Sequence, residues 1–100
     1  MNNTNQLRIS RKNEILDRLG ISKSTFHNRI NDGLFPPPIS LGERAVGWPS
    51  YEVDEILSYL VAGKTKEAVK TLVCAQIRYR EKSIASSSTV YSNALAKYSK

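Results

Sequence analysis

The stretch Ile21–Phe35 decides how this chain folds, and it reads ISKSTFHNRINDGLF. Ser22 is a favoured N-cap residue, because its hydroxyl accepts a hydrogen bond from a backbone amide in the first helical turn. Phe26 and Ile30 lie four residues apart and therefore on one side of a helix. Gly33 follows as a residue that closes helices in the left-handed conformation. The stretch therefore predicts a short helix with a thin apolar side.

The opposite side of this predicted helix is rich in hydrogen-bonding groups. Its residues are Lys23, Ser24, Thr25, His27, Asn28 and Arg29. Such a face suits the major groove of DNA, whose floor presents hydrogen-bond donors and acceptors. We interpret the helix as a recognition helix, and the alternative is an ordinary solvated helix face.

A first short helix is predicted immediately upstream, over residues 11–19, with Ser10 as its N-cap. Its buried side is formed by Ile15, Leu16 and Leu19. Gly20 then permits a sharp turn, and Ile21 fills the angle between the two helices. Two short helices joined by such a turn have the proportions of a helix-turn-helix.

A β-hairpin is predicted after Pro36–Pro38, three prolines that stop a helix and keep the chain extended. Residues 39–41 and 45–48 are short alternating segments around the connection Gly42-Glu43-Arg44, a pattern typical of a hairpin. A hairpin wing with Arg44 at its tip, beside a recognition helix, suits the DNA backbone or minor groove. The alternative is a solvated arginine.

A third helix is predicted from Ser50, its N-cap, to Gly63. Glu52 and Asp54 fall in its first turns, where negative charge suits the helix dipole. Its core stripe is Val53, Ile56, Leu57 and Leu60. We expect this helix to pack behind the first two, with its acidic face turned away from DNA.

A fourth, basic amphipathic helix is predicted over residues 65–83. One apolar stripe is Ala68, Leu72, Ala75 and Tyr79, with Val69, Val73 and Ile77 beside it. The domain or a second copy of the same helix must cover so broad a face. The late bases Arg78, Arg80 and Lys82 either bind phosphates or favour the negative end of the helix. Cys74 is expected to be a small buried hydrophobe.

Composition divides the chain into four segments. Residues 1–9 lack periodicity and indicate a flexible arm, although Leu7 and Ile9 alternate with polar neighbours and a short strand is the alternative. The other segments are the predicted DNA-binding domain at 10–63, the basic helix at 64–84 and a polar tail at 85–100.

Charge is segregated along the chain, whose net charge is +6. Residues 1–48 carry seven Lys or Arg against four acids, residues 49–63 carry three acids and no base, and residues 64–100 carry eight bases against two acids. Basic ends around an acidic middle indicate two phosphate-facing surfaces and one face turned away.

The sequence favours no enzyme, cofactor or membrane function. One cysteine and one histidine leave a zinc or thiol–imidazole site with too few ligands, and no phosphate loop, carboxylate pair or nucleophile–base signature is present. No apolar run approaches the roughly 18 residues of a membrane helix, and Met1–Gln6 do not resemble a secretion signal. We therefore expect a cytoplasmic protein whose partner is double-stranded DNA, without a small-molecule substrate.

The ordered set of motifs resembles the AlpA-type prophage regulators and the related excisionases with a MerR-like winged-helix fold. The residues that carry the resemblance are Leu19–Thr25, Ile30, Gly33, Phe35-Pro36, Leu41–Trp48 and Glu52-Val53. The resemblance implies a mainly α winged helix-turn-helix with a small β-hairpin, followed here by a C-terminal helix. It also implies a non-enzymatic DNA-binding regulator of integration or excision genes, or a recombination directionality factor.

By position, the resemblance places Ser22, Lys23, Ser24, Thr25 and Asn28 in or beside the recognition helix and Arg44 in the wing. Asn28 suits adenine and Arg29 or Lys23 suits guanine, whereas the hydroxyl side chains suit phosphates. His27 and Arg29 depart from the family pattern, so DNA contact and inward packing both stay open for them. The aromatic and apolar residues expected in the core are Phe26, Phe35, Leu41 and Trp48.

A second hypothesis is a protein-interaction module. In this case residues 65–83 would contact a second copy or a partner such as an integrase or a polymerase subunit.

Overall fold

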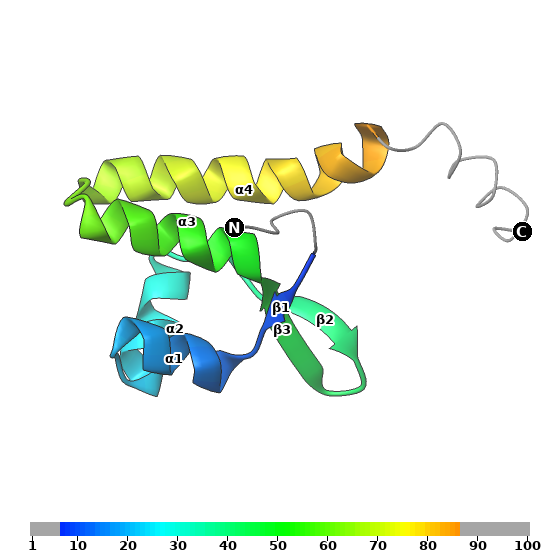
Figure 1. The fold of residues 1–100 in the computed structure, drawn as a ribbon, viewed down its shortest axis with the longest axis horizontal. Helices are drawn as coiled ribbons and strands as arrows, with labels where there is room; N and C mark the ends of the chain where they lie inside the picture. The colour runs from blue at the N-terminus through cyan, green and yellow to red at the C-terminus, as the bar shows by residue number, and fades with distance from the viewer. Residues whose placement is uncertain (1–6, 87–100) are drawn as a thin grey trace, which may run out of the picture.

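The computed structural model describes residues 7–86, and its elements are shown in Figure 1. In chain order they are β1 (Ile9–Ser10), α1 (Lys12–Leu19), α2 (Lys23–Asn31), β2 (Ile39–Gly42), β3 (Ala45–Pro49), α3 (Ser50–Val61) and α4 (Lys66–Ser86). The predicted mainly helical fold with a small hairpin is confirmed. Residues 1–6 of the predicted arm and 87–100 of the predicted tail lie outside the described residues.

The turn between α1 and α2 is built as the sequence predicts. Gly20 ends α1 in the left-handed conformation with φ +66°, and its N–H donates to the Leu16 carbonyl at 2.8 Å. The Ile21 side chain packs against the core from this turn. The turn between the helices is therefore short, because a residue in the left-handed conformation ends a helix and changes the direction of the chain.

The two serine caps predicted at the starts of the first and third helices are wrong. Arg11 occupies the N-cap of α1 and Pro49 that of α3, and neither caps through its side chain. Ser10 instead lies buried in β1, where its hydroxyl shares a 2.7 Å hydrogen bond with the hydroxyl of Ser50. The cause is the pairing of β1 with the end of β3, which turns the two serines toward each other.

The three strands form one antiparallel sheet in the order β1-β3-β2. The predicted hairpin is confirmed as β2 and β3, with Ser40 opposite Val46 and an irregularity between Ser40 and Gly42. The strand alternative at the N-terminus is confirmed for Ile9, which lies opposite Pro49, whereas Leu7 precedes the strand. The N-terminal segment therefore joins the sheet before α1 begins.

The core gathers one apolar side from every helix around three aromatic rings. Phe26 packs edge-on against Phe35 and Trp48, with ring centroids 4.9 and 5.2 Å away. The other buried apolar residues are Ile15, Val53, Ile56, Val69 and Val73. Leu41, expected in this core, is 40% exposed. It lies beside Ile9 over Gly47, on the sheet face opposite Trp48, because successive residues of a strand point to opposite faces.

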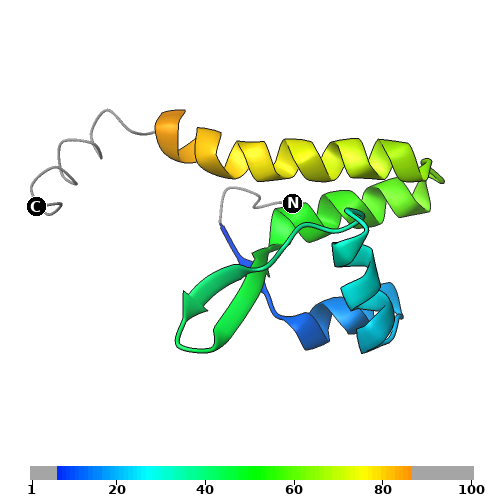
Figure 2. The same cartoon turned by 180° about the vertical axis from the view of Figure 1, so that it is seen from behind.

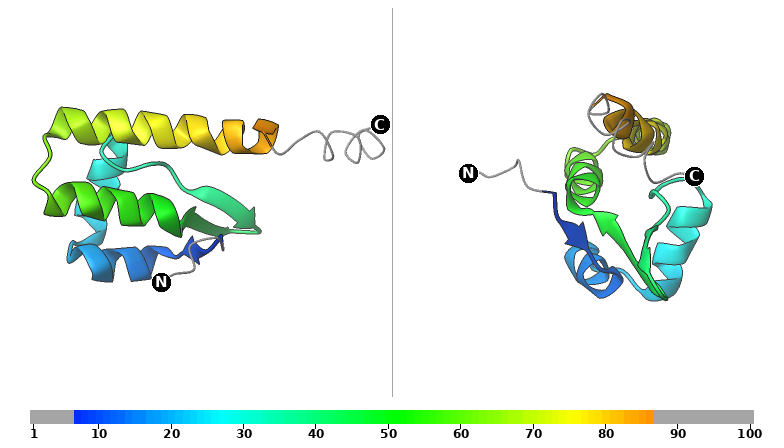
Figure 3. Two further views of the ribbon diagram at one scale, coloured as in Figure 1. Left: turned by 45° about the horizontal axis from the view of Figure 1, so that its top comes forward. Right: turned by 90° about the vertical axis from the view of Figure 1, so that its right-hand side faces the viewer.

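Helix α4 forms a further layer over α3, on the side away from α1 (Figures 1 and 3). The predicted stripe of α4 is offset by one residue from the side that is buried. Ala75 and Tyr79 are exposed, as is Cys74, and the buried residues are Val69, Val73 and Gln76, with Arg80 next along the same side. These positions tolerate Gln76 and Arg80 because both side chains donate hydrogen bonds to Glu52 of α3.

Helix α3 also departs from its predicted pattern. Val53 and Ile56 are buried as expected, but Leu60 is 38% exposed. Glu52, expected on an outward acidic face, is fully buried under α4. No helix between residues 7 and 86 has the length and apolar character needed to cross a membrane.

Candidate nucleic-acid interface

Helix α2 presents a polar outer side over a single buried aromatic residue. Phe26 is fully buried, and the exposed residues of the predicted site on this helix are Lys23, Ser24, Thr25, His27 and Asn28. These side chains come from the first two turns of one helix, so they form a continuous strip of donors and acceptors. His27 is exposed and does not pack inward, and its contact with DNA stays a prediction.

Two hydroxyl groups of the predicted site also fix the start of α2. Ser22 accepts a hydrogen bond from the backbone N–H of Thr25 at 3.2 Å, and its hydroxyl lies 3.0 Å from the Thr25 hydroxyl. The predicted N-cap is therefore confirmed. Both residues remain exposed, so capping the helix leaves them at the surface beside Lys23.

Arg29 lies at the edge of this strip and is half-buried. Its Nε atom is buried without a hydrogen-bond partner among the described residues. The side chain lines a groove of about 360 Å³ between α2 and the start of α4. The residues beside it in the groove are Thr25, Asn28, Asp32, Leu34, Leu60, Lys64, Lys66 and Val69. Of the two alternatives for Arg29, the geometry shows partial inward packing.

Lys64 and Lys66 are site neighbours that sequence reasoning missed. The turn between α3 and α4 brings them into the same groove as Asn28, although they lie more than thirty positions away in the sequence. The signal that pointed to them was the excess of bases after residue 63. What the sequence does not provide is the direction in which α4 returns along α3.

The hairpin carries Arg44 at its exposed tip. Arg44 adopts a left-handed backbone with φ +59°, which is uncommon for a residue with a side chain. Figure 2 shows α2 and the segment leading from it to β2 on the side toward the viewer, with the hairpin projecting beside them. Arg44 is therefore an exposed base on the hairpin that follows α2 in the chain.

The link between α2 and the hairpin is anchored from below. The indole Nε1–H of Trp48 donates to the Pro36 carbonyl at 2.8 Å in a buried hydrogen bond. Because Pro36, Pro37 and Pro38 have no N–H, their carbonyls are the only backbone hydrogen-bonding groups that this part of the link offers. The predicted core position of Trp48 is confirmed, and its indole N–H also holds the link at Pro36.

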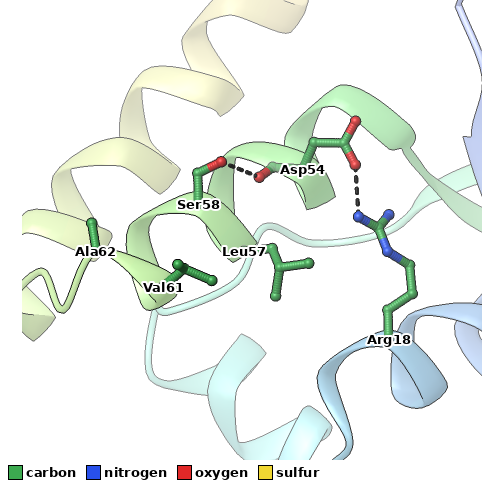
Figure 4. A pocket seen from close by; sticks show the side chains of 6 residues that line it. All are labelled: Arg18, Asp54, Leu57, Ser58, Val61 and Ala62. Carbon is green, nitrogen blue, oxygen red and sulfur yellow. Dashed lines mark hydrogen bonds and ion pairs between the residues drawn. The ribbon is translucent and has the colours of Figure 1, made fainter.

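Another concavity, of about 510 Å³, lies between α1 and α3 (Figure 4). Arg18 donates to Asp54 at 2.8 Å on one side of it, and Leu57 and Val61 line the other. The Ser58 hydroxyl donates to the Asp54 carbonyl at 3.0 Å. These polar groups are already paired with each other, so we assign no ligand site to this concavity.

Taken together, the exposed polar helix, the arginine-tipped hairpin and the basic groove define the surface of a small regulatory module. A family model described as prophage CP4-57 regulatory protein (AlpA) matches residues 8–59. The match covers more than half of the chain, and the chain belongs to this AlpA family of prophage regulatory proteins. The resemblance read from the sequence is therefore confirmed, and with it the expectation of a regulator that is not an enzyme.

Two curated relatives agree with this family. The DNA-binding transcriptional activator AlpA of Escherichia coli strain K12 is 34% identical over 64 residues, which are 58% of this chain and 91% of the relative. The uncharacterized protein ORF88 of Enterobacteria phage P4 is 36% identical over 61 residues, covering 61% of this chain and 69% of the relative. No solved structure matches the chain. The family match ends within α3, so α4 lies beyond it.

Proposed function

We propose that this protein is a winged helix-turn-helix regulator that binds double-stranded DNA, with α2 in the major groove. The hairpin would act as the wing, resting on the adjacent backbone or minor groove through Arg44. One observation carries the proposal: the outer side of α2 exposes Lys23, Ser24, Thr25, His27 and Asn28 over the buried Phe26. The family, one of whose members is a DNA-binding transcriptional activator, supports the same reading.

Within this proposal the residues of α2 divide into two groups. Asn28 and Lys23 are the proposed base readers, because an amide suits adenine and an ammonium group suits guanine. Ser22, Ser24 and Thr25 are the proposed phosphate contacts near the start of the helix. His27 is exposed and is included among the DNA contacts. Arg29 is assigned to the edge of the protein groove between α2 and α4. Its half-buried side chain would reach the bases of the DNA major groove less readily than Lys23 or Asn28.

The cellular role that we propose is regulation of integration or excision genes, or direction of recombination at attachment sites, by a cytoplasmic protein bound to DNA. A footprint of the full chain on its source genome region separates the two roles. Protected sites upstream of a promoter support the regulator, and clustered sites beside an attachment sequence support a directionality factor. A uniform absence of protection would contradict both.

The wing contact is tested by Arg44→Asn, because asparagine tolerates the left-handed backbone and removes only the long cationic side chain. We expect affinity to fall by a similar factor on specific and nonspecific DNA. The slope of log affinity against log salt should fall by about 1, as for the loss of one phosphate contact. Fluorescence anisotropy at several salt concentrations measures both. A salt slope identical to that of the wild type would contradict the wing model.

A second candidate function is protein binding through residues 65–83, most of which lie in α4, to a second copy, an integrase or a polymerase subunit. The observation that favours it is the exposure of Ile77 and Tyr79, at 40% and 53%, on a helix that lies outside the family match. Sedimentation of the full chain tests self-association, with Tyr79→Glu as the variant expected to abolish it. A salt-insensitive complex with a protein and no DNA binding would favour this function over the first.

A further inference from the structure

Glu52 is a carboxylate with no exposed surface, at the first turn of α3. Arg80 of α4 meets it with two hydrogen bonds, from Nε to Oε2 at 2.8 Å and from Nη2 to Oε1 at 2.7 Å. A buried carboxylate is strongly disfavoured unless a partner of opposite charge and fixed geometry meets it, and the planar guanidinium provides this geometry. The pair therefore holds α4 onto α3.

The same guanidinium reaches a second target. Nη2 of Arg80 also donates to the Pro37 carbonyl at 2.9 Å. The preceding carbonyl, that of Pro36, accepts from the Trp48 indole at 2.8 Å. Two consecutive carbonyls of the proline segment are therefore held by different elements, one by α4 and one by β3. We call Arg80, Glu52, Trp48 and the carbonyls of Pro36 and Pro37 the proline clamp.

The proline clamp lies where it can determine the position of the hairpin. Pro36–Pro38 are the last three residues of the connection between α2, which ends at Asn31, and β2, which begins at Ile39, so their placement sets where the hairpin begins. Proline residues restrict φ, and an extended segment anchored at two points transmits its position directly to the strand that follows. Figure 3 shows this segment running beside α3 and below α4 before it enters β2.

We infer that Arg80 is a positioning residue for the wing: through the proline clamp it fixes the hairpin relative to α2, and Arg80 itself does not contact DNA. The structural part of this inference stands on the clamp geometry, and its effect on DNA affinity rests on the proposed function. It also assigns one of the late bases of α4 to Glu52 and the Pro37 carbonyl in place of a phosphate. The family-matched region ends at residue 59, so this clamp is completed from outside it.

The first experiment uses the full chain without DNA. Arg80→Lys keeps the positive charge but has one nitrogen in place of the planar guanidinium, so it cannot bridge both Glu52 oxygens and the Pro37 carbonyl with the same geometry. We expect amide hydrogen exchange to accelerate about tenfold or more in β2 and β3, with little change in α1 and α2, and the emission of Trp48, the single tryptophan, to change. Arg78→Lys, an exposed base on the same helix, is the matched control and should leave both signals unchanged.

Two outcomes of that experiment would overturn the inference. One is a folded Arg80→Lys variant whose hairpin exchange and Trp48 emission match the wild type. The other is an equal acceleration at every amide, which would show a general loss of stability and no specific effect on the hairpin. Circular dichroism confirms that the variant is folded, and Glu52→Gln provides a second variant that weakens the clamp from the other side.

The second experiment is a double-mutant cycle on DNA affinity with Arg80→Lys and Arg44→Asn. If Arg80 acts through the wing, Arg44→Asn should weaken binding roughly five- to tenfold in the wild type but less than about twofold beside Arg80→Lys. Additive losses would overturn the route through the wing. If the wild type binds no DNA, the proposed function fails, and the exchange experiment alone decides whether the clamp positions the hairpin.

Discussion

Helices α2 and α4 both carry lysine and arginine on a polar side, but they differ in how far their polar residues are exposed. On α2 the side chains of Lys23 and Asn28 stay exposed. On α4, Gln76 is buried and Arg80 is paired with a fully buried carboxylate. The difference comes from the neighbouring element, because α3 offers α4 a buried Glu52 and offers α2 no comparable partner among the described contacts. The exposed bases of α2 are thus available to a partner, whereas Arg80 of α4 is already paired with Glu52.

The largest expected effect breaks the ion pair of α4. Arg80→Met should lower the free energy of unfolding by about 3 kcal/mol, because it leaves Glu52 charged, buried and unpaired. The 19% exposure of the Arg80 side chain places the expected effect at the lower end of the range for such pairs. Urea unfolding followed by circular dichroism measures the change.

The double variant Glu52→Gln with Arg80→Met should recover part of that loss, since the buried group is then neutral. A loss below about 0.5 kcal/mol in Arg80→Met would place the pair among ordinary surface ion pairs, and the contrast with α2 would disappear.

The next effect belongs to α2. Asn28→Ala should weaken binding to a selected specific DNA site by about 1–3 kcal/mol, the usual contribution of one bidentate base contact, and leave nonspecific binding nearly unchanged. Titrations of both DNAs measure the difference. Arg78→Ala on α4 is the control, and a larger loss of specificity from it than from Asn28→Ala would reverse the comparison between the helices.

A smaller effect concerns the start of α2. Ser22→Ala removes the hydroxyl that accepts from the Thr25 N–H and should destabilise the protein by about 1 kcal/mol. Thermal unfolding at one protein concentration is sufficient to detect it. Ser24→Ala, two residues further and without a hydrogen bond of this kind in the structure, should change stability by less than about 0.5 kcal/mol. Equal losses in the two variants would contradict the cap.

The smallest effect is a pH dependence at the edge of α4. Burial first, and then the charge of Glu52, raise the pKa of Tyr51, whose ring packs edge-on against Tyr79. Because the pKa is higher in the folded state, the folded protein holds this proton more tightly, so its contribution to stability is present below about pH 10 and is lost as pH rises above it. Tyr51→Phe should flatten this part of the stability curve, and an unchanged slope between pH 9 and 11 would contradict it.

The sequence predicts the local features of the fold and site well. Gly20, the Ser22 cap and the hairpin around Arg44 are each specified by residues within a few positions of one another. The same is true of the exposed strip on α2, since the positions of Phe26 and Ile30 define which side faces outward. Short-range chemistry is sufficient for these features.

The features that the sequence did not predict depend on residues far apart in the chain. Ser10 reads as a helix cap until β1 pairs with β3 and brings Ser50 against it. Glu52 reads as an outward acid until Arg80, 28 positions later, closes over it. Leu41 reads as core because its apolar character does not reveal which face of the sheet is covered. In each case the deciding partner is set by the topology and not by the local pattern.

Gly47 adds a constraint of a different kind, because this residue of β3 lies against Ile9 and Ser10 of the paired strand β1. A methyl group at this position would lie 2.5 Å from Cγ2 of Ile9 and 3.2 Å from the Ser10 carbonyl oxygen. The other four glycines have a positive φ, and Gly47 does not. Its small size is therefore what matters here, and backbone freedom is not. If codon 47 were fully randomised and the clones were selected for folding, we expect glycine to be recovered almost exclusively, with rare alanine clones accompanied by a smaller residue at position 9.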